Sequence, residues 1–144
     1  MLPALLQPLA PLFVKAGVSL GGLSEGQRRL VLGLVWAGLP AVPMSERDVN
    51  EALKTELAGA ASFLDTDHVE LRRWLVDAGW LARDGFGRKY ERVDGASLPS
   101  PLQPLAAAFA GVDTAAIAAA TRAAHAAERE SRQRAWRERS GEPN

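Results

Sequence analysis

Residues 67–93 decide the fold of this chain, and they read DHVELRRWLVDAGWLARDGFGRKYERV. Asp67 with Glu70 three residues later is typical of a helix start, because the first side chain can accept a hydrogen bond from a backbone amide of the first turn. Apolar residues then recur at helical spacing, and Gly79 indicates where the helix ends. The stretch therefore opens with a predicted amphipathic helix over residues 67–78.

The second half of the same stretch predicts a β-hairpin. Two short runs, 80–84 and 88–93, flank Gly85-Phe86-Gly87, and a glycine-containing turn between extended runs is typical of antiparallel strands. Two further helix starts lie upstream, at Ser24 and at Ser45. Three helices followed by a hairpin are the order of a winged helix-turn-helix domain.

Composition divides the 144 residues into four segments. They are a Leu/Pro-rich helical segment (1–22), a winged-helix-like domain (23–93), a linker of turn formers (94–101) and an Ala/Arg-rich helical extension (102–144). The predicted fold class is mainly α with a small β-hairpin, a winged helix-turn-helix-like core and a long C-terminal helix.

The pentamer Leu-Gln-Pro-Leu-Ala occurs twice, at residues 6–10 and 102–106. Chance in a chain rich in Leu and Ala is one interpretation. The other is a pair of equivalent short helices, each with a proline early in its first turn, packing symmetrically against the core or against each other.

Charge and cysteine usage narrow the class of protein. Seventeen basic residues balance seventeen acidic ones, so binding to nucleic acid would need a local basic patch. The absence of cysteine removes thiolate chemistry and fits a reducing cytoplasm. His68 and His125 lie in different segments, and no His/carboxylate set has the spacing of a metal site. We therefore expect a cytoplasmic protein that is not an enzyme, holds no metal or cofactor and does not enter a membrane.

Two stretches carry a resemblance to a known family. Residues 45–54 read SERDVNEALK, and residues 67–85 read DHVELRRWLVDAGWLARDG. Together they resemble the bacterial domain of unknown function 2087, over about residues 25–93. The resemblance implies a winged-helix-like fold and, because some members are fused to ArsR-type regulators, work related to transcription.

The predicted nucleic-acid contacts are cations of the third helix and the hairpin. In helix-turn-helix domains the recognition helix enters the major groove of DNA, and in winged helices the hairpin touches the backbone or the minor groove. Glu70 and Asp77 lie at helical spacing from Arg73 and can pair with it, whereas Arg72 has no carboxylate at such spacing. Charge on the hairpin can also serve solubility alone. The candidates are Arg72, Arg73, Arg83, Arg88, Lys89 and Arg92.

Two functions follow from these observations. The first is a transcription-associated regulator that binds double-stranded DNA, with six Arg against three Glu in residues 122–139 as an auxiliary basic helix. The second is a module that binds a partner protein or forms a homodimer. Residues 45–93 hold eight basic and ten acidic residues, and this balance opposes strong duplex binding.

Overall fold

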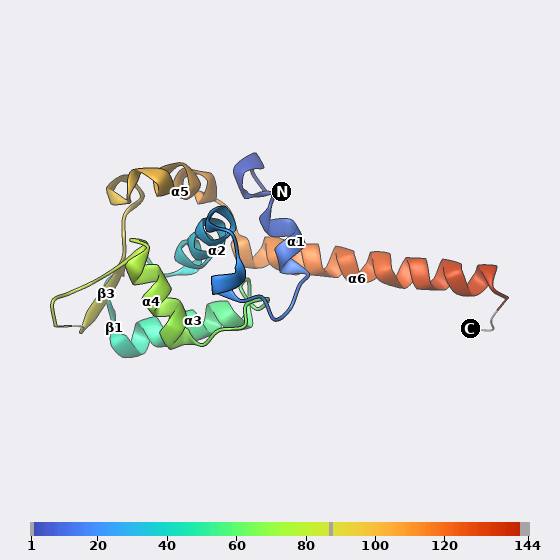
Figure 1. Cartoon of the computed structure of the whole chain (residues 1–144), viewed down its shortest axis with the longest axis horizontal. Helices are drawn as coiled ribbons and strands as arrows, with labels where there is room; N and C mark the ends of the chain where they lie inside the picture. The colour runs from blue at the N-terminus through green and yellow to red at the C-terminus, as the bar shows by residue number, and fades with distance from the viewer. Residues whose placement is uncertain (1, 87, 142–144) are drawn as a thin grey trace.

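The computed structural model describes residues 2–86 and 88–141, and Figure 1 shows a body of short helices from which one long helix extends. The central elements are helix α2 (Glu25–Gly38), strand β1 (Met44–Ser45), helices α3 (Glu46–Ala58) and α4 (His68–Asp77), and strands β2 (Leu81–Arg83) and β3 (Lys89–Arg92). Before them come the 3-10 turn η1 (Ala4–Leu6), helix α1 (Leu9–Phe13) and turn η2 (Leu20–Gly22). After them come turns η3 (Gly95–Ser97) and η4 (Ser100–Leu102) and helices α5 (Gln103–Phe109) and α6 (Thr114–Arg139). The predicted fold class is confirmed in that the chain is mainly helical, with a small antiparallel sheet and a long C-terminal helix.

Side-chain caps set where the predicted helices begin. Ser24 and Gln27 form a reciprocal capping box at the start of α2, with N–O distances of 3.1 and 3.2 Å. The Ser45 hydroxyl accepts from the amide of Asp48 at 3.0 Å, and the Asp67 carboxylate accepts from the amide of Glu70 at 2.8 Å. Each contact satisfies an amide that has no partner within its own helix.

The sheet has three antiparallel strands in the order β1-β3-β2. Strand β2 pairs with β3 as predicted, with Leu81 opposite Arg92 and Arg83 opposite Tyr90. Strand β1 was not predicted, because its two residues carry no alternating pattern and lie directly before a helix cap. Gly87 of the predicted turn lies outside the described residues.

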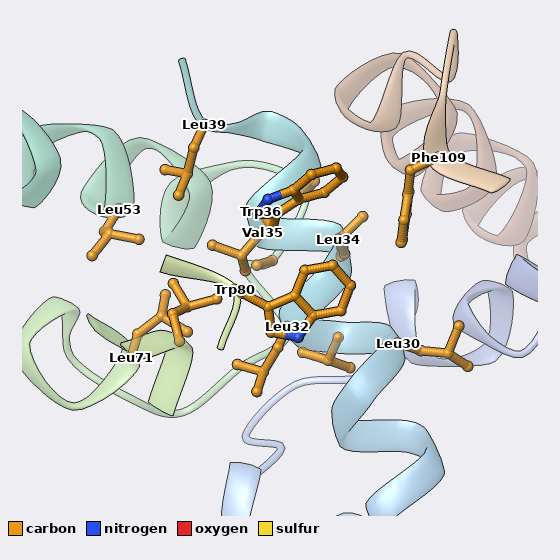
Figure 2. Packing of buried hydrophobic residues seen from close by; sticks show 14 of the residues in the cluster. Leu30, Leu32, Leu34, Val35, Trp36, Leu39, Leu53, Leu71, Trp80 and Phe109 are labelled. Atoms are coloured by element: carbon orange, nitrogen blue, oxygen red, sulfur yellow. The ribbon is translucent and has the colours of Figure 1, made fainter. Parts of the chain in front are cut away.

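Helix α2 is the centre of the hydrophobic core. Residues 30–36 are all buried, so the helix is covered on every side rather than on one stripe. Figure 2 shows the Trp80 ring lying beside Trp36, with ring centroids 5.4 Å apart. A Cβ at Gly33 would lie 2.9 Å from Phe109 and 3.0 Å from Trp80, so only glycine lets both rings approach the helix this closely.

The segments on either side of the central elements complete this same core. Leu6, Leu9 and Phe13 before it, and Phe109 and Ala118 after it, are at most 3% exposed and belong to one cluster with α2. Both pentamer copies run from a 3-10 turn into an α-helix, and η1 contacts α5. This arrangement fits two equivalent short helices and leaves the origin of the repeat open.

Across the described residues, no helix taken singly combines the length and apolar character that crossing a membrane requires. Ser100–Phe109 and Thr114–Arg139 meet those two criteria only as a pair, and they are bent by 71° at the break between them.

Candidate interaction surface

Helix α4 buries one face and presents the other to solvent. Leu71 and Leu75 are fully buried and hold the helix on the core. The outer face carries the exposed residues Asp67, Val69, Glu70, Arg73 and Asp77. Three carboxylates and one guanidinium therefore face outward, and Val69 adds apolar area with 47% of its surface exposed.

Arg73 does not make the ion pairs that its spacing suggested. Among the described residues it forms no salt bridge with Glu70 or Asp77, because helical spacing brings side chains near each other without fixing their rotamers. Its side chain instead lines an open hollow of about 510 Å³ along α4. The other lining residues are Asp67, Val69, Glu70, Trp74 and Asp77. We call this hollow the α4 groove.

Arg72 has no carboxylate at helical spacing, as the sequence indicated, but its side chain finds polar partners on another helix. Its guanidinium donates to Asn50 Oδ1 at 2.6 Å, reaches Glu46 Oε1 at 3.5 Å and lies 5.2 Å from the ring centre of Tyr90. The side chain is only 17% exposed. Both oxygens belong to α3, distant in sequence, so helical spacing could not reveal them. Arg72 ties α4 to α3 and β3, and little of it remains available to a ligand.

Arg92 is also engaged inside the fold. Its Nη1 donates to the carbonyls of Trp36, Ala37 and Leu39 at 3.2–3.4 Å, and its guanidinium lies 4.4 Å from the Trp36 ring centre. These carbonyls lie at the end of α2, where helix carbonyls lack the amide of a following turn, and the Trp36 carbonyl also accepts from the Leu39 amide at 3.1 Å. Arg92 therefore caps α2 instead of pointing outward as a hairpin contact.

Three of the predicted cations remain exposed on the hairpin, namely Arg83, Arg88 and Lys89. The turn between the strands is ordered by Asp84, whose Oδ1 accepts from the amides of Phe86 at 3.2 Å and Arg88 at 2.9 Å. Phe86 at the tip is 85% exposed. The pattern Gly85-Phe86-Gly87 predicted only a turn, and the one signal in the sequence for an exposed ring was the unusual position of a Phe between two glycines.

The hairpin and α4 form one continuous surface. A second hollow of about 240 Å³ lies between them, lined by Val69, Arg72, Arg73, Val76, Asp77, Arg83 and Tyr90. It opens beside the α4 groove, and Val69, Arg73 and Asp77 line both. The acidic face of α4 and the basic hairpin are thus neighbours.

The C-terminal helix does not join this surface. Arg122 donates to the carbonyls of Phe13, Gly59 and Ala60 at 2.8–3.0 Å, and burial lowers the pKa of its guanidinium. Figure 1 shows the rest of α6 extending from the body on the side opposite the strands. Its Arg132 and Arg134 face Glu128 and Glu130 at 3.9 and 3.2 Å. The predicted auxiliary basic helix and the hairpin therefore lie at opposite ends of the molecule.

One carboxyl group away from this surface, that of Glu56, is half-buried. Glu56 of α3 packs against the end of α2, where a Cβ at Gly38 would lie 2.6 Å from its carboxyl carbon. Burial raises the pKa of Glu56 to about 7. His68 is half-buried, and the described residues contain no group of three or more metal-ligating side chains.

The fold and surface define a small helical domain with a three-stranded antiparallel sheet and a mixed-charge outer face. Residues 23–92 match the sequence profile of a family described as an uncharacterized protein conserved in bacteria, domain of unknown function 2087. The resemblance seen in the sequence is therefore confirmed over that segment. No curated protein and no solved structure matches the chain.

Proposed function

We propose that the chain is a winged-helix-type binding module, with α4 in the place of the recognition helix and the β2–β3 hairpin in the place of the wing. The order helix, strand, helix, helix, strand, strand and the sheet order β1-β3-β2 support this assignment. In helix-turn-helix domains the recognition helix presents its outer side chains to the ligand. The exposed side chains of α4 then determine which kind of ligand the module binds.

The exposed face of α4 favours a protein partner. Asp67, Glu70 and Asp77 repel phosphate, and the affinity of proteins for duplex DNA comes largely from Lys and Arg contacts with phosphates. Arg73 alone opposes them on this face, because Arg72 is bound to α3. Exposed Val69 and the half-buried Trp74 add the apolar and aromatic area that protein interfaces use. This acidic, partly apolar face is the observation that carries the proposal.

Duplex DNA is the second candidate, and the hairpin is the specific observation that favours it. Arg83, Arg88 and Lys89 are exposed around Phe86, and proteins that bind the minor groove combine such cations with an inserted apolar side chain. In that case the protein is a transcription-associated regulator whose hairpin, rather than α4, contacts the duplex. We propose a cytoplasmic location for either candidate, which the absence of cysteine supports, and neither candidate requires a cofactor.

Site-specific photocrosslinking tests the proposal in the bacterium that makes the protein. A photoreactive residue at position 69, inside the α4 groove, is expected to give protein adducts. The same residue at exposed Thr55 on α3 is the matched control and is expected to give none. The proposal fails if position 69 also gives none.

Fluorescence anisotropy with duplex DNA tests the second candidate. Binding at 50 mM salt that is lost in the Arg88→Glu/Lys89→Glu variant would favour DNA. An unchanged anisotropy at micromolar protein would remove that candidate.

A further inference from the structure

The hairpin tip carries an apolar group that its own chain leaves uncovered. Phe86 is 85% exposed, although the turn that holds it is fixed by two hydrogen bonds to Asp84. An exposed phenyl ring on a backbone turn held by hydrogen bonds resembles the aromatic anchors of protein interfaces, since Phe has only two side-chain torsions to order on binding.

The α4 groove has apolar lining that such a ring can contact. It is an open hollow along one helix, so a ring can reach it from solvent, and Val69 and Trp74 supply apolar contact area. Because Phe86 is almost fully exposed, it does not occupy the groove of its own chain.

Charge around the two features is complementary. The exposed cations of the hairpin, Arg83, Arg88 and Lys89, outnumber its exposed carboxylates Asp84 and Glu91. The groove has the opposite excess, since the exposed carboxylates Asp67, Glu70 and Asp77 outnumber Arg73. Opposite charges around an apolar contact fix its register and raise the association rate. The whole chain holds seventeen basic and seventeen acidic residues, so two copies do not repel each other at long range.

We propose that the partner of this surface is a second copy of the same chain, with Phe86 of each copy seated in the α4 groove of the other. The inference rests on the proposed function, since it names the protein that the α4–hairpin surface binds. The hairpin and the groove are neighbours on one face, so a two-fold axis through that face exchanges both contacts at once. Such an exchange closes the dimer and leaves neither feature open for further growth.

Sedimentation velocity on the full chain, as a dilution series from about 2 to about 200 µM, tests the assembly. We expect a reversible dimer, and Phe86→Ser is expected to weaken it at least about tenfold, from the transfer free energy of a buried Phe side chain. Trp136→Ser is the matched control, because Trp136 is also a large exposed ring, 55% exposed, but lies on α6. Its dimer is expected to match the wild type. A wild type that stays monomeric, an equal effect of both substitutions, or species larger than dimers would overturn the inference.

Charge reversal tests which surfaces meet. Glu70→Lys/Asp77→Lys makes both features of one copy basic, and Arg88→Glu/Lys89→Glu makes both acidic. Each variant alone is expected to be monomeric, and an equimolar mixture is expected to dimerise, because both half-contacts are again complementary. A mixture that stays monomeric overturns the inference.

The two proposals fail in different ways. If photocrosslinking at position 69 gives adducts only with other proteins, the inference is wrong and the proposed function stands. If it gives no protein adduct, the proposed function itself is wrong. Adducts with the mass of two copies support both.

Discussion

Replacing Glu56 by Gln removes a carboxyl group that is half-buried against the end of α2. Burial raises the pKa of Glu56 from 4.5 to about 7, so the folded protein binds this proton more tightly than the unfolded chain does. The contribution of Glu56 to the free energy of unfolding is then fully present below pH 4.5 and is lost as the pH rises through 7. Gln is neutral at every pH, so the variant lacks this dependence.

The magnitude follows from the two pKa values. Their difference of about 2.5 corresponds to about 3.4 kcal/mol at 1.36 kcal/mol per pH unit. The carboxyl keeps part of its contact with water, which screens the effect, so we expect about 1–2 kcal/mol. Between pH 5 and pH 8 the wild type should lose this amount of stability relative to Glu56→Gln.

Urea denaturation at half-unit steps across that interval measures the difference. Subtracting the variant's curve from the wild-type curve cancels the contributions of all other groups. Glu51→Gln is the comparison variant, because Glu51 is exposed on the same helix, where it pairs with exposed Lys54 at 3.2 Å. Solvent weakens such a pair, so this variant should differ from the wild type by less than Glu56→Gln does. Parallel curves for the wild type and Glu56→Gln would refute the assignment of a raised pKa to this carboxyl.

Three further substitutions test the packing that positions the surface. Gly33→Val should destabilise the fold by about 3 kcal/mol in thermal or urea unfolding, because its side chain would meet Phe109 and Trp80 within 3.0 Å or less. A neutral effect would mean that the two rings can move aside. Arg92→Ala should lower the free energy of unfolding by about 1–2 kcal/mol, because it removes the cap on α2 and the contact with Trp36. Arg88 is exposed, so Arg88→Ala should change that free energy by less than about 0.5 kcal/mol. Arg122→Ala should lower the free energy of unfolding by about 2–3 kcal/mol and speed hydrogen exchange in the first turns of α6. Arg129 is exposed, so Arg129→Ala should do neither. Equal exchange rates in the two variants would contradict the anchoring role of Arg122.

Features that depend on neighbouring residues could be predicted from the sequence. Ser24, Ser45 and Asp67 cap their helices within three residues of their own positions, so the pattern alone locates each helix start. The hairpin is likewise set by two short runs that are close in sequence. Local hydrogen bonding and periodicity are sufficient for these elements.

Contacts between distant residues could not be predicted in this way. Arg72 finds Asn50 and Glu46 across 22 and 26 positions, and Arg92 finds the end of α2 across more than 50. Both cations looked available in the sequence because their partners are on other elements. The exposure of Phe86 depends equally on what the rest of the chain leaves uncovered.

The shared core limits how far the chain can be truncated without exposing buried side chains. The family match covers residues 23–92, but helices α1 and α5, which lie outside that range, contact α2, and their Phe13 and Phe109 belong to the same hydrophobic cluster. A fragment of residues 23–92 would expose one side of the apolar helix α2 to solvent. We expect such a fragment to aggregate or to bind another apolar surface. The unit of folding is thus longer than the unit of sequence similarity.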